Sequence, residues 1–453
     1  MAIATIRILR AAALLLAATL AAPVQAETLA DALRSAYRHS GLLQQNRALL
    51  RAADEDVAAA TAALRPVVTY SLGGNYSSLT RSTSANIGLS ASLLLYDAGA
   101  TGTRREIARE NVLSMREALR GVEQNVLVRA ASAFMTVRRD GNILSLRENN
   151  MRLIEQELQA ARDRFEVGEI TRTDVALAEA RLASARSALA AARGSLDRAR
   201  EEYRAAIGHY PAALDPPPAP PGTAASLEAA RQIAQSRHPD MAQASHSVRV
   251  ADLNVVIAEA ALMPRLSASA NASIADGGSD SSSVGLSLSG PVYRGGALAS
   301  SIRKARAQAE ASRSGLHLTR HRIDQDVGNA WSQLTVAEAG LKASDEQIRA
   351  SRVAFRGVRE EAALGARTTL DVLNAEQELL DAEAARISAE ADRYAAVYNL
   401  LAAMGLLNTK HLGLGVATYD PAAYYNAVRD APLTAVSPQG KKLDHVLKAL
   451  GKQ

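Results

Sequence analysis

The sequence predicts a mainly α-helical fold that also contributes strands to a transmembrane β-barrel. Three observations support this fold class. The chain repeats itself at an offset of about 198 residues, so that Pro66 returns as Pro264. Each copy contains two segments that alternate between apolar and polar residues, followed by a proline-free segment of about 65 residues. We therefore expect tandem repeats, each built as helix, β-hairpin, very long helix and returning helix.

The composition excludes several classes of protein. The chain has 453 residues and no cysteine, which rules out disulfide scaffolds, thiolate metal sites, thiol enzymes and lipoproteins acylated on cysteine. Only 4% of the residues are aromatic, so the cores lack their usual large side chains and rely on alanine-rich helix packing. The net charge is +5, but acidic and basic residues are interspersed, and we expect no nucleic-acid partner.

Residues 1–26 are predicted to be a signal peptide. Two arginines precede the apolar segment 11–22, which is too short to span a bilayer, and the small-residue pattern at 24–26 matches a cleavage site. The alternative is an uncleaved anchor helix. We expect export of the chain and cleavage before Glu27.

The mature chain is predicted to contain two repeats, 27–210 and 226–408, joined by the proline-rich linker 211–225 and followed by the tail 409–453. Matched positions extend along the whole unit: Pro66 with Pro264, Tyr96 with Tyr293, Phe134 with Trp331, and Gly168 with Gly365. Chance similarity between alanine-rich helices is the alternative. It does not explain why glycine, proline and tyrosine recur at the same places, so we expect two copies of one structural unit.

Each repeat opens with a helical pattern, which runs from Leu29 to Leu64 in the first copy, and then continues into two strands. We expect the strands at about 66–96 and about 264–293, because the residues there alternate with a period of two. One face carries valine, leucine, isoleucine and tyrosine, and the other carries serine, threonine, glycine and asparagine. The hairpin tips, Ser77–Ser84 and Ala275–Ser283, are small and polar.

Very long helices follow the strands. The segments from Gly99 to Arg164 and from Gly295 to Ala362 would each form a helix about 100 Å long. Each segment turns at a glycine, Gly168 or Gly365, into a returning helix with a heptad repeat, which is typical of coiled coils. The two shorter helices of a repeat together match the long one in length. We therefore expect them to stack end to end beside it, with the β-hairpin at one end and the glycine turn at the other.

The strands have a length that suits a membrane. About ten residues cross a bilayer when a strand is tilted, and a polar opposite face suits a water-filled lumen. Four strands are too few to close a barrel, and an unpaired strand edge is not tolerated in lipid, so the chain must share one barrel within an oligomer. The alternative is a soluble β-sandwich flanked by coiled coils, in which the apolar faces pack on each other.

The doubled helix–hairpin–helix unit, the paired prolines and tyrosines, and the Gly-x5-Asp-Val turns resemble the TolC family of outer-membrane efflux and secretion channels. The resemblance covers residues 27–407 and is most specific at the second turn, Gly365–Asn374. It implies a homotrimer with a twelve-stranded barrel, four strands from each chain, continuous with an α-helical periplasmic tunnel. It also implies three kinds of partner: outer-membrane lipid, a periplasmic adaptor protein that docks at the Gly168 and Gly365 turns, and an inner-membrane transporter of the ABC type.

The resemblance further implies a gate at the periplasmic tip of the tunnel. The matching residues are Thr173, Asp174, Arg367, Asp371 and Asn374. An arginine can bond a carboxylate and a threonine oxygen together, and a ring of Asp371 carboxylates would favour cations. Asn374 stands where a second acidic residue is common in the family, and Ala362 stands where a tyrosine can occur. The alternative role of Asp174 and Asp371 is to complement the dipoles of helix N-termini.

The sequence contains no recognisable catalytic constellation, so we expect neither an enzyme nor a cofactor. His317 and His321 lie four residues apart but lack a third ligand nearby, and we expect no metal. The expected function is a passive exit duct for type I protein secretion, because 419–429 resembles the ending of secretion-linked members and the lipidated cysteine of many efflux members is missing. The alternatives are a drug-efflux duct, a periplasmic adaptor, which would not repeat its hairpin in tandem, and a soluble coiled-coil scaffold.

Overall fold

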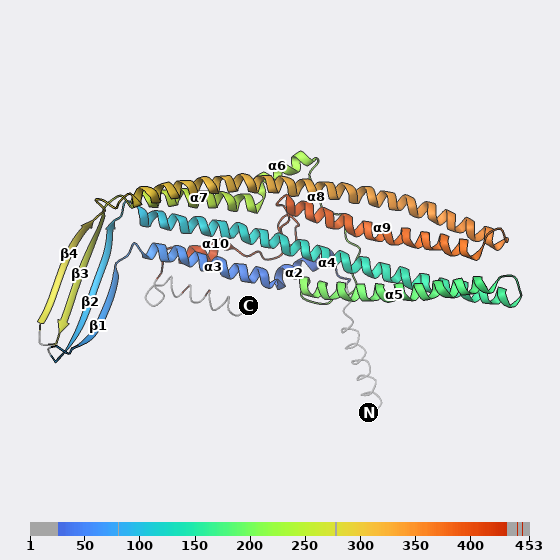
Figure 1. The fold of residues 1–453 in the computed structure, drawn as a ribbon, viewed down its shortest axis with the longest axis horizontal. Helices are drawn as coiled ribbons and strands as arrows, with labels where there is room; N and C mark the ends of the chain where they lie inside the picture. The colour runs from blue at the N-terminus through green and yellow to red at the C-terminus, as the bar shows by residue number, and fades with distance from the viewer. Residues whose placement is uncertain (1–25, 80, 277–278, 433–441, 443–445, 447–453) are drawn as a thin grey trace, which may run out of the picture.

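The computed structural model describes residues 26–79, 81–276, 279–432, 442 and 446. The chain is elongated (Figure 1). A four-stranded sheet lies at one end, and the two turns that connect pairs of long helices lie at the other. Two series of elements follow each other in the same order, helix, helix, strand, strand, long helix, helix, and a short helix follows them. The predicted signal peptide lies almost wholly outside the described residues, as do most positions of the tail beyond 432.

The first series comprises α2 (Leu29–His39), α3 (Gly41–Ala62), β1 (Val67–Ser77), β2 (Ser82–Tyr96), α4 (Ala100–Glu166) and α5 (Arg172–Ile207). The second comprises α6 (Leu227–Arg237), α7 (Pro239–Ala260), β3 (Arg265–Ala275), β4 (Ser279–Ser289), α8 (Ala297–Ala363) and α9 (Thr369–Ala403), and α10 (Pro421–Val428) follows. Helices α4 and α8 have 67 residues each, which gives a length of about 100 Å. These lengths agree with the proline-free segments of the sequence.

The helix expected from Leu29 to Leu64 is in fact two helices, so the sequence expectation was wrong at Ser40. This residue has an extended conformation, and its hydroxyl accepts a hydrogen bond from the amide of Leu43, which caps the start of α3. The second series breaks at the equivalent place, where His238 caps α7 and Pro239 occupies its first turn. The break allows the chain to change direction where the two short helices meet.

The helices lie side by side and change partners halfway along the molecule. Near the sheet, α4 packs between α3 and α7, and α7 packs against α8. Toward the turns, α4 packs against α5 and α9, and α9 packs against α8. Helix α8 therefore has α7 as its partner in the half nearer the sheet and α9 in the half nearer the turns (Figure 1), and α4 exchanges α3 and α7 for α5 and α9.

The largest apolar cluster lies where the partners change, and we call it the equatorial core. Its fully buried members include Leu127 and Phe134 of α4, Tyr203 of α5, and Leu400 and Leu401 of α9. The proline-rich linker is held at the same level, because the hydroxyl of Tyr394 donates a 2.9 Å hydrogen bond to the carbonyl of Pro218. Buried residues from seven of the described helices, α2 to α6, α8 and α9, meet here, so large side chains can be buried on all sides.

The tail packs along α3 toward the sheet. The guanidinium of Arg47 lies 5.1 Å from the ring centre of Tyr37 and 5.4 Å from that of Tyr419. Asp54 is fully buried beneath the tail, and within the described part of the chain neither of its carboxylate oxygens has a hydrogen-bond partner. Burial raises the pKa of Asp54 to about 6, although nearby Arg116 opposes the shift.

The four strands form one antiparallel sheet in the order β1, β2, β3, β4. Its register is continuous across all four strands apart from an irregularity between Leu94 and Tyr96. The hairpin tips are shorter than expected, since β2 already begins at Ser82 and β4 at Ser279.

Candidate functional site

The sheet has one apolar and one polar face, because its register places like residues in rows. One row across the strands is Val68, Ala91, Ala270 and Val284, and the next row is Thr69, Ser90, Asn271 and Ser283. The hydroxyls of Thr69 and Ser90 lie 2.6 Å apart within the polar row. The alternation read from single strands therefore extends across the four strands at this level, whereas toward the hairpin tips the apolar rows end in Ser282 and Asp280 on β4.

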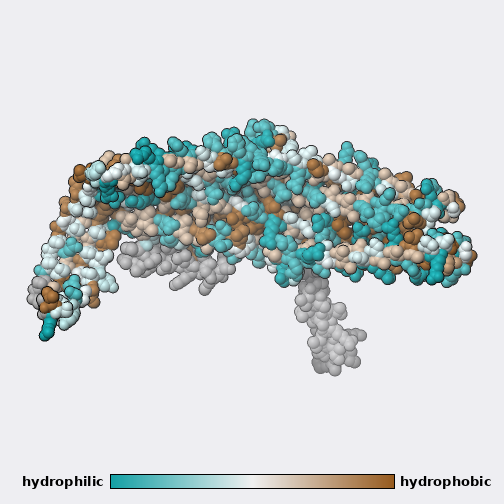
Figure 2. Space-filling view, in the orientation of Figure 1, coloured by the Kyte–Doolittle hydropathy of each residue, from teal (hydrophilic) through white to brown (hydrophobic). Residues whose placement is uncertain are grey.

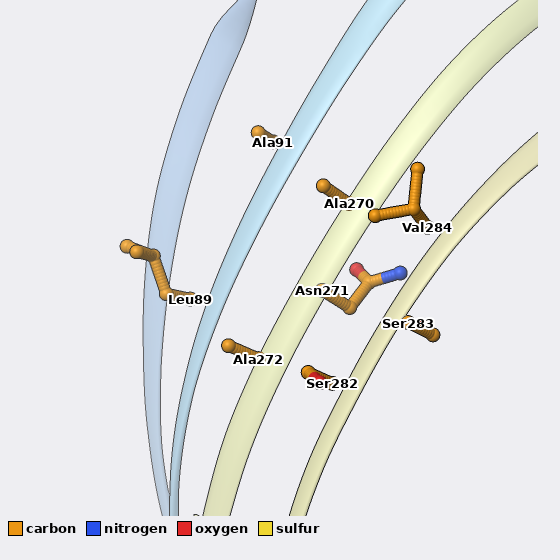
Figure 3. A pocket seen from close by; sticks show the side chains of 8 residues that line it. All are labelled: Leu89, Ala91, Ala270, Asn271, Ala272, Ser282, Ser283 and Val284. Carbon is orange, nitrogen blue, oxygen red and sulfur yellow. The ribbon is translucent and has the colours of Figure 1, made fainter.

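The apolar face is strongly exposed in the isolated chain. Tyr70 is 86% exposed and Val284 is 88% exposed, and neighbouring leucines of β1 and β4 are exposed as well. Figure 3 shows the side chains that line a shallow hollow across β2, β3 and β4, among them Leu89, Ala272 and Val284 together with polar residues such as Ser282. An exposed apolar surface that continues across a sheet is costly in water and marks a contact with lipid or protein.

Both edges of the sheet are open. Within the described strands, β1 pairs only with β2 and β4 pairs only with β3. Each edge is eleven residues long, so its backbone amides and carbonyls form a template for a further strand.

The other end of the molecule consists of two tight turns between coiled-coil helices, one of which joins α4 to α5 and the other α8 to α9. Gly168 has a φ of 82° and Gly365 a φ of 77°, in the left-handed region that glycine adopts at low cost. Beside the glycines, Val167 and Leu364 are largely exposed (Figure 2 shows apolar residues among the polar ones at this end). The two hairpins thus present similar small apolar tips.

The two predicted gate aspartates cap the returning helices. Asp174 and Thr171 bond each other reciprocally at the start of α5, and Asp371 and Thr368 do the same at the start of α9. The bonds from the threonines hold the pKa of both carboxyls below the ordinary value. In the isolated chain both aspartates therefore serve helix N-termini, which was the alternative role considered from the sequence.

The other three predicted gate residues lie nearby but do not form one cluster. The Nε of Arg367 donates a 2.8 Å hydrogen bond to Glu361 of its own hairpin rather than to an aspartate or threonine. Thr173 is exposed in the first turn of α5. Asn374 accepts a 2.6 Å hydrogen bond from Arg181 of α5 and is, within the described residues, the one member of the five that bonds to the other hairpin.

Sequence reasoning missed most of the contacts that join the two hairpins. In the part of the chain that the structure describes, four close polar pairs join the hairpins, and we call them the inter-hairpin latch: Asn150 with Glu376 at 2.8 Å, Arg181 with Asn374 at 2.6 Å, Arg147 with Asp381 at 3.8 Å, and Arg359 with Glu157 at 3.9 Å. The first pair is buried, whereas Arg181, Asn374 and Arg359 are half-buried or exposed. The centre of the latch is therefore shielded from solvent, whereas its edge is exposed to solvent.

Glu376 is the most unusual residue of the latch. It is 5% exposed, and burial raises the pKa of its carboxyl to about 7, with a further contribution from Glu157. The bond from Asn150 and the charges of Arg359 and Arg181 oppose the shift but do not cancel it. A sequence signal existed, because Glu376 follows Leu373 by three positions and precedes Leu380 by four, where a coiled coil normally places an apolar residue.

Other kinds of site are absent from the part of the chain that the structure describes. No cluster of three or more histidine, aspartate or glutamate side chains could hold a metal ion there, and His317 and His321 are exposed. None of the described helices is long and apolar enough to cross a bilayer.

A two-faced sheet with open edges, joined to a pair of long coiled coils, defines the class of outer-membrane channels with a helical extension. The chain belongs to the outer membrane efflux protein family, whose model matches residues 32–209 and 230–406. The resemblance to the TolC family is confirmed, and the protein is an outer-membrane protein.

Two relatives and one solved structure illustrate the match. The chain is 36% identical over 443 residues to the outer membrane efflux protein BepC of Brucella suis biovar 1, covering 95% of this chain and 97% of that one. It is 28% identical over 346 residues to the alkaline protease secretion protein AprF of Pseudomonas aeruginosa, covering 70% and 72%. The crystal structure of CusC superposes with a TM-score of 0.76 at 20% identity, covering 84% of this chain and 92% of CusC.

Proposed function

We propose that this protein is the passive outer-membrane exit duct of a tripartite export machine. The proposal rests on the structure of the sheet. Its apolar face is exposed, and its opposite face is lined by hydroxyl and amide groups. Both of its edges are open. A lipid-facing band and a water-filled lumen require such a sheet.

The open edges support a homotrimer. A strand edge in lipid must find a partner, because unpaired backbone groups cost several kcal/mol each in hydrocarbon. Three copies joined through β1 of one chain and β4 of the next would give twelve strands and no edge. The soluble sandwich does not fit this surface, because Tyr70 and Val284 are uncovered in the folded chain.

The helical half would continue the wall of the duct into the periplasm. In this proposal residues 27–210 and 226–408 form the two repeats, 211–225 and the first part of the tail surround the equator, and 1–26 are removed. A periplasmic adaptor would dock at the exposed Gly168 and Gly365 turns and link the duct to an inner-membrane transporter of the ABC type. The gate at the tip would involve Thr173, Asp174, Arg367, Asp371 and Asn374, with opposing hairpins of neighbouring chains completing the contacts.

Two kinds of cargo have support. Efflux of small molecules is supported by the 36% identity to BepC, which is an efflux protein and matches over nearly the whole chain. Type I protein secretion is supported by the 28% identity to AprF, a protease secretion protein. The hydroxyl-lined face of the sheet does not discriminate between the two kinds of cargo.

Deletion of the gene tests both the duct and its cargo. The deletion strain is compared with the parent for growth in a panel of dyes, detergents and antibiotics, and its culture medium is compared for secreted proteins. Increased drug sensitivity with unchanged secretion would assign efflux, and retained secreted protein with unchanged sensitivity would assign secretion. A purified product that stays monomeric and dispersed without detergent would contradict the duct itself.

A further inference from the structure

We propose that Glu376 is a proton-operated element of the inter-hairpin latch, which holds the two coiled-coil hairpins together when the carboxyl is neutral and releases them when it is ionised. The inference rests on the proposed duct for its functional meaning, but the latch itself is a property of the single chain. The inference adds Glu376 to the residues of the predicted gate, and it makes the contact between the hairpins depend on pH.

The geometry places the carboxyl at the junction of the hairpins. Glu376 lies on α9 and accepts a 2.8 Å hydrogen bond from the amide of Asn150 on α4, 226 positions earlier in the chain. Both side chains are buried, at 5% and 8% exposure. A bond between α4 and α9 joins the first hairpin to the second, so it breaks when the hairpins separate.

Each helix near Glu376 contributes charged groups, and most of them already have partners. Glu157 of α4 lies 3.9 Å from Arg359 of α8, and Arg181 of α5 donates to Asn374 of α9. Arg181 and Arg359 favour the ionised carboxyl, whereas Glu157 disfavours it. Neither arginine forms an ion pair with Glu376 in the described structure, so the buried carboxylate would lose its hydration without gaining a direct counter-charge.

The direction of the pH effect follows from this balance. In the closed latch the carboxyl has a pKa of about 7, above its ordinary value of 4.5, which applies when separated hairpins expose it to water. The closed arrangement therefore holds the proton and the separated one releases it. The latch has its full strength below about pH 4.5 and loses strength as the pH rises toward and through 7.

The first measurement is the pH profile of the single-channel conductance in planar bilayers. For the unaltered protein we expect the open probability to rise by about tenfold or more between pH 5 and pH 8, since one unit of pKa shift is a tenfold change. Glu376→Gln keeps a neutral side chain of the same shape, and its open probability should stay low and change less than about twofold. Glu378→Gln, at an exposed position of the same helix, is the matched control and should keep the original profile.

A second measurement follows the hairpins without relying on conductance. Because the chain has no cysteine, Val167→Cys and Leu364→Cys place two spin labels on the exposed hairpin tips. The label-to-label distance in the detergent-solubilised full chain should increase from pH 5 to pH 8, and Glu376→Gln should abolish the increase.

The outcomes separate this inference from the proposed duct. Conductance with the same pH profile in Glu376→Gln as in the unaltered protein would overturn the latch and leave the duct intact. A fall in open probability with rising pH would also overturn it, because Arg181 and Arg359 would then be neutralising the carboxylate. A chain without conductance at any pH would contradict the duct, and the spin-label distances would still decide on the latch.

Discussion

The equatorial core and the periplasmic tip are built from the same two coiled coils but are stabilised in different ways. At the equator, α2, α4, α5, α8 and α9 surround large side chains such as Phe134 and Tyr203, which are completely buried. Near the tip, the apolar cluster of the first hairpin has six members, three of them alanine, and lies between α4 and α5. In this half the polar latch joins the two hairpins.

This difference separates stability from mobility. Burial of large apolar groups from several helices is expensive to undo, whereas a few hydrogen bonds with solvent-exposed neighbours contribute about 1 kcal/mol each. The equator can therefore stay assembled while the tip changes arrangement. Three tests of the comparison follow, in order of decreasing effect on the free energy of unfolding.

The strongest test uses two phenylalanines of the same helix. Phe134→Ala at the equator should cost about 3–5 kcal/mol, because it leaves a large cavity among fixed neighbours. Phe165→Ala, where the side chain is 44% exposed near the tip, should cost less than about 1 kcal/mol. Thermal unfolding of the detergent-solubilised protein, followed by circular dichroism, measures both. Equal losses at the two positions would contradict the contrast between equator and tip.

A smaller and opposite effect is expected at Asp54, the buried carboxyl beneath the tail. Its pKa of about 6 lies above the ordinary value of 3.8, so the ionised form lowers stability, and the loss develops as the pH rises from about 4 to about 6. Asp54→Asn should therefore raise stability by about 1–2 kcal/mol at pH 8 and have little effect at pH 4.

The same variant compares the two buried carboxyls. Asp54 lies in the half nearer the sheet and Glu376 in the half nearer the turns, so Asp54→Asn should leave the pH profile of the conductance unchanged. Asp56→Asn, at an exposed position of the same helix, is the control for stability. If Asp54→Asn altered the pH profile of the conductance, the protonation of Asp54 beneath the tail would also affect the arrangement of the tip.

The smallest effect on stability is expected at the predicted gate. Arg367 is exposed and bonds to Glu361 of its own turn, so Arg367→Glu should leave the melting temperature unchanged. The new charge beside Glu361 and Asp371 should repel the tip contacts and raise the single-channel conductance. Unchanged conductance would count against the gate assignment, and a lowered melting temperature would show that the tip contributes more to stability than its contacts indicate.

Local patterns in the sequence predicted the elements well. Helices α4 and α8 were expected because no proline interrupts them, and the strands because alternation over ten residues has one simple structural solution. The break at Ser40 was missed, since a serine within an otherwise helical pattern does not reveal whether it caps a new helix. Capping depends on where the chain must bend, and that is decided by packing against α4 and α5.

The candidate site was harder to predict because its contacts join distant segments. The turns at Gly168 and Gly365 could be located from a glycine followed by an aspartate, but their aspartates bond locally to Thr171 and Thr368. The pairing of Asn150 with Glu376 depends on which helix lies beside α9, and a single sequence does not contain that information. The one local signal was Glu376 itself, a charged residue at a heptad position of α9 that is normally apolar.

The unbroken length of α4 and α8 has a mechanical consequence. Each helix extends from the sheet past the equator to the tip, so the part beyond the equatorial core acts as a lever arm of about 50 Å. A rotation of about 5° at the fulcrum would move the end of such an arm by about 4 Å, which exceeds the span of a hydrogen bond. Small rotations in the well-packed middle would thereby be amplified into larger displacements of the helix ends at the turns.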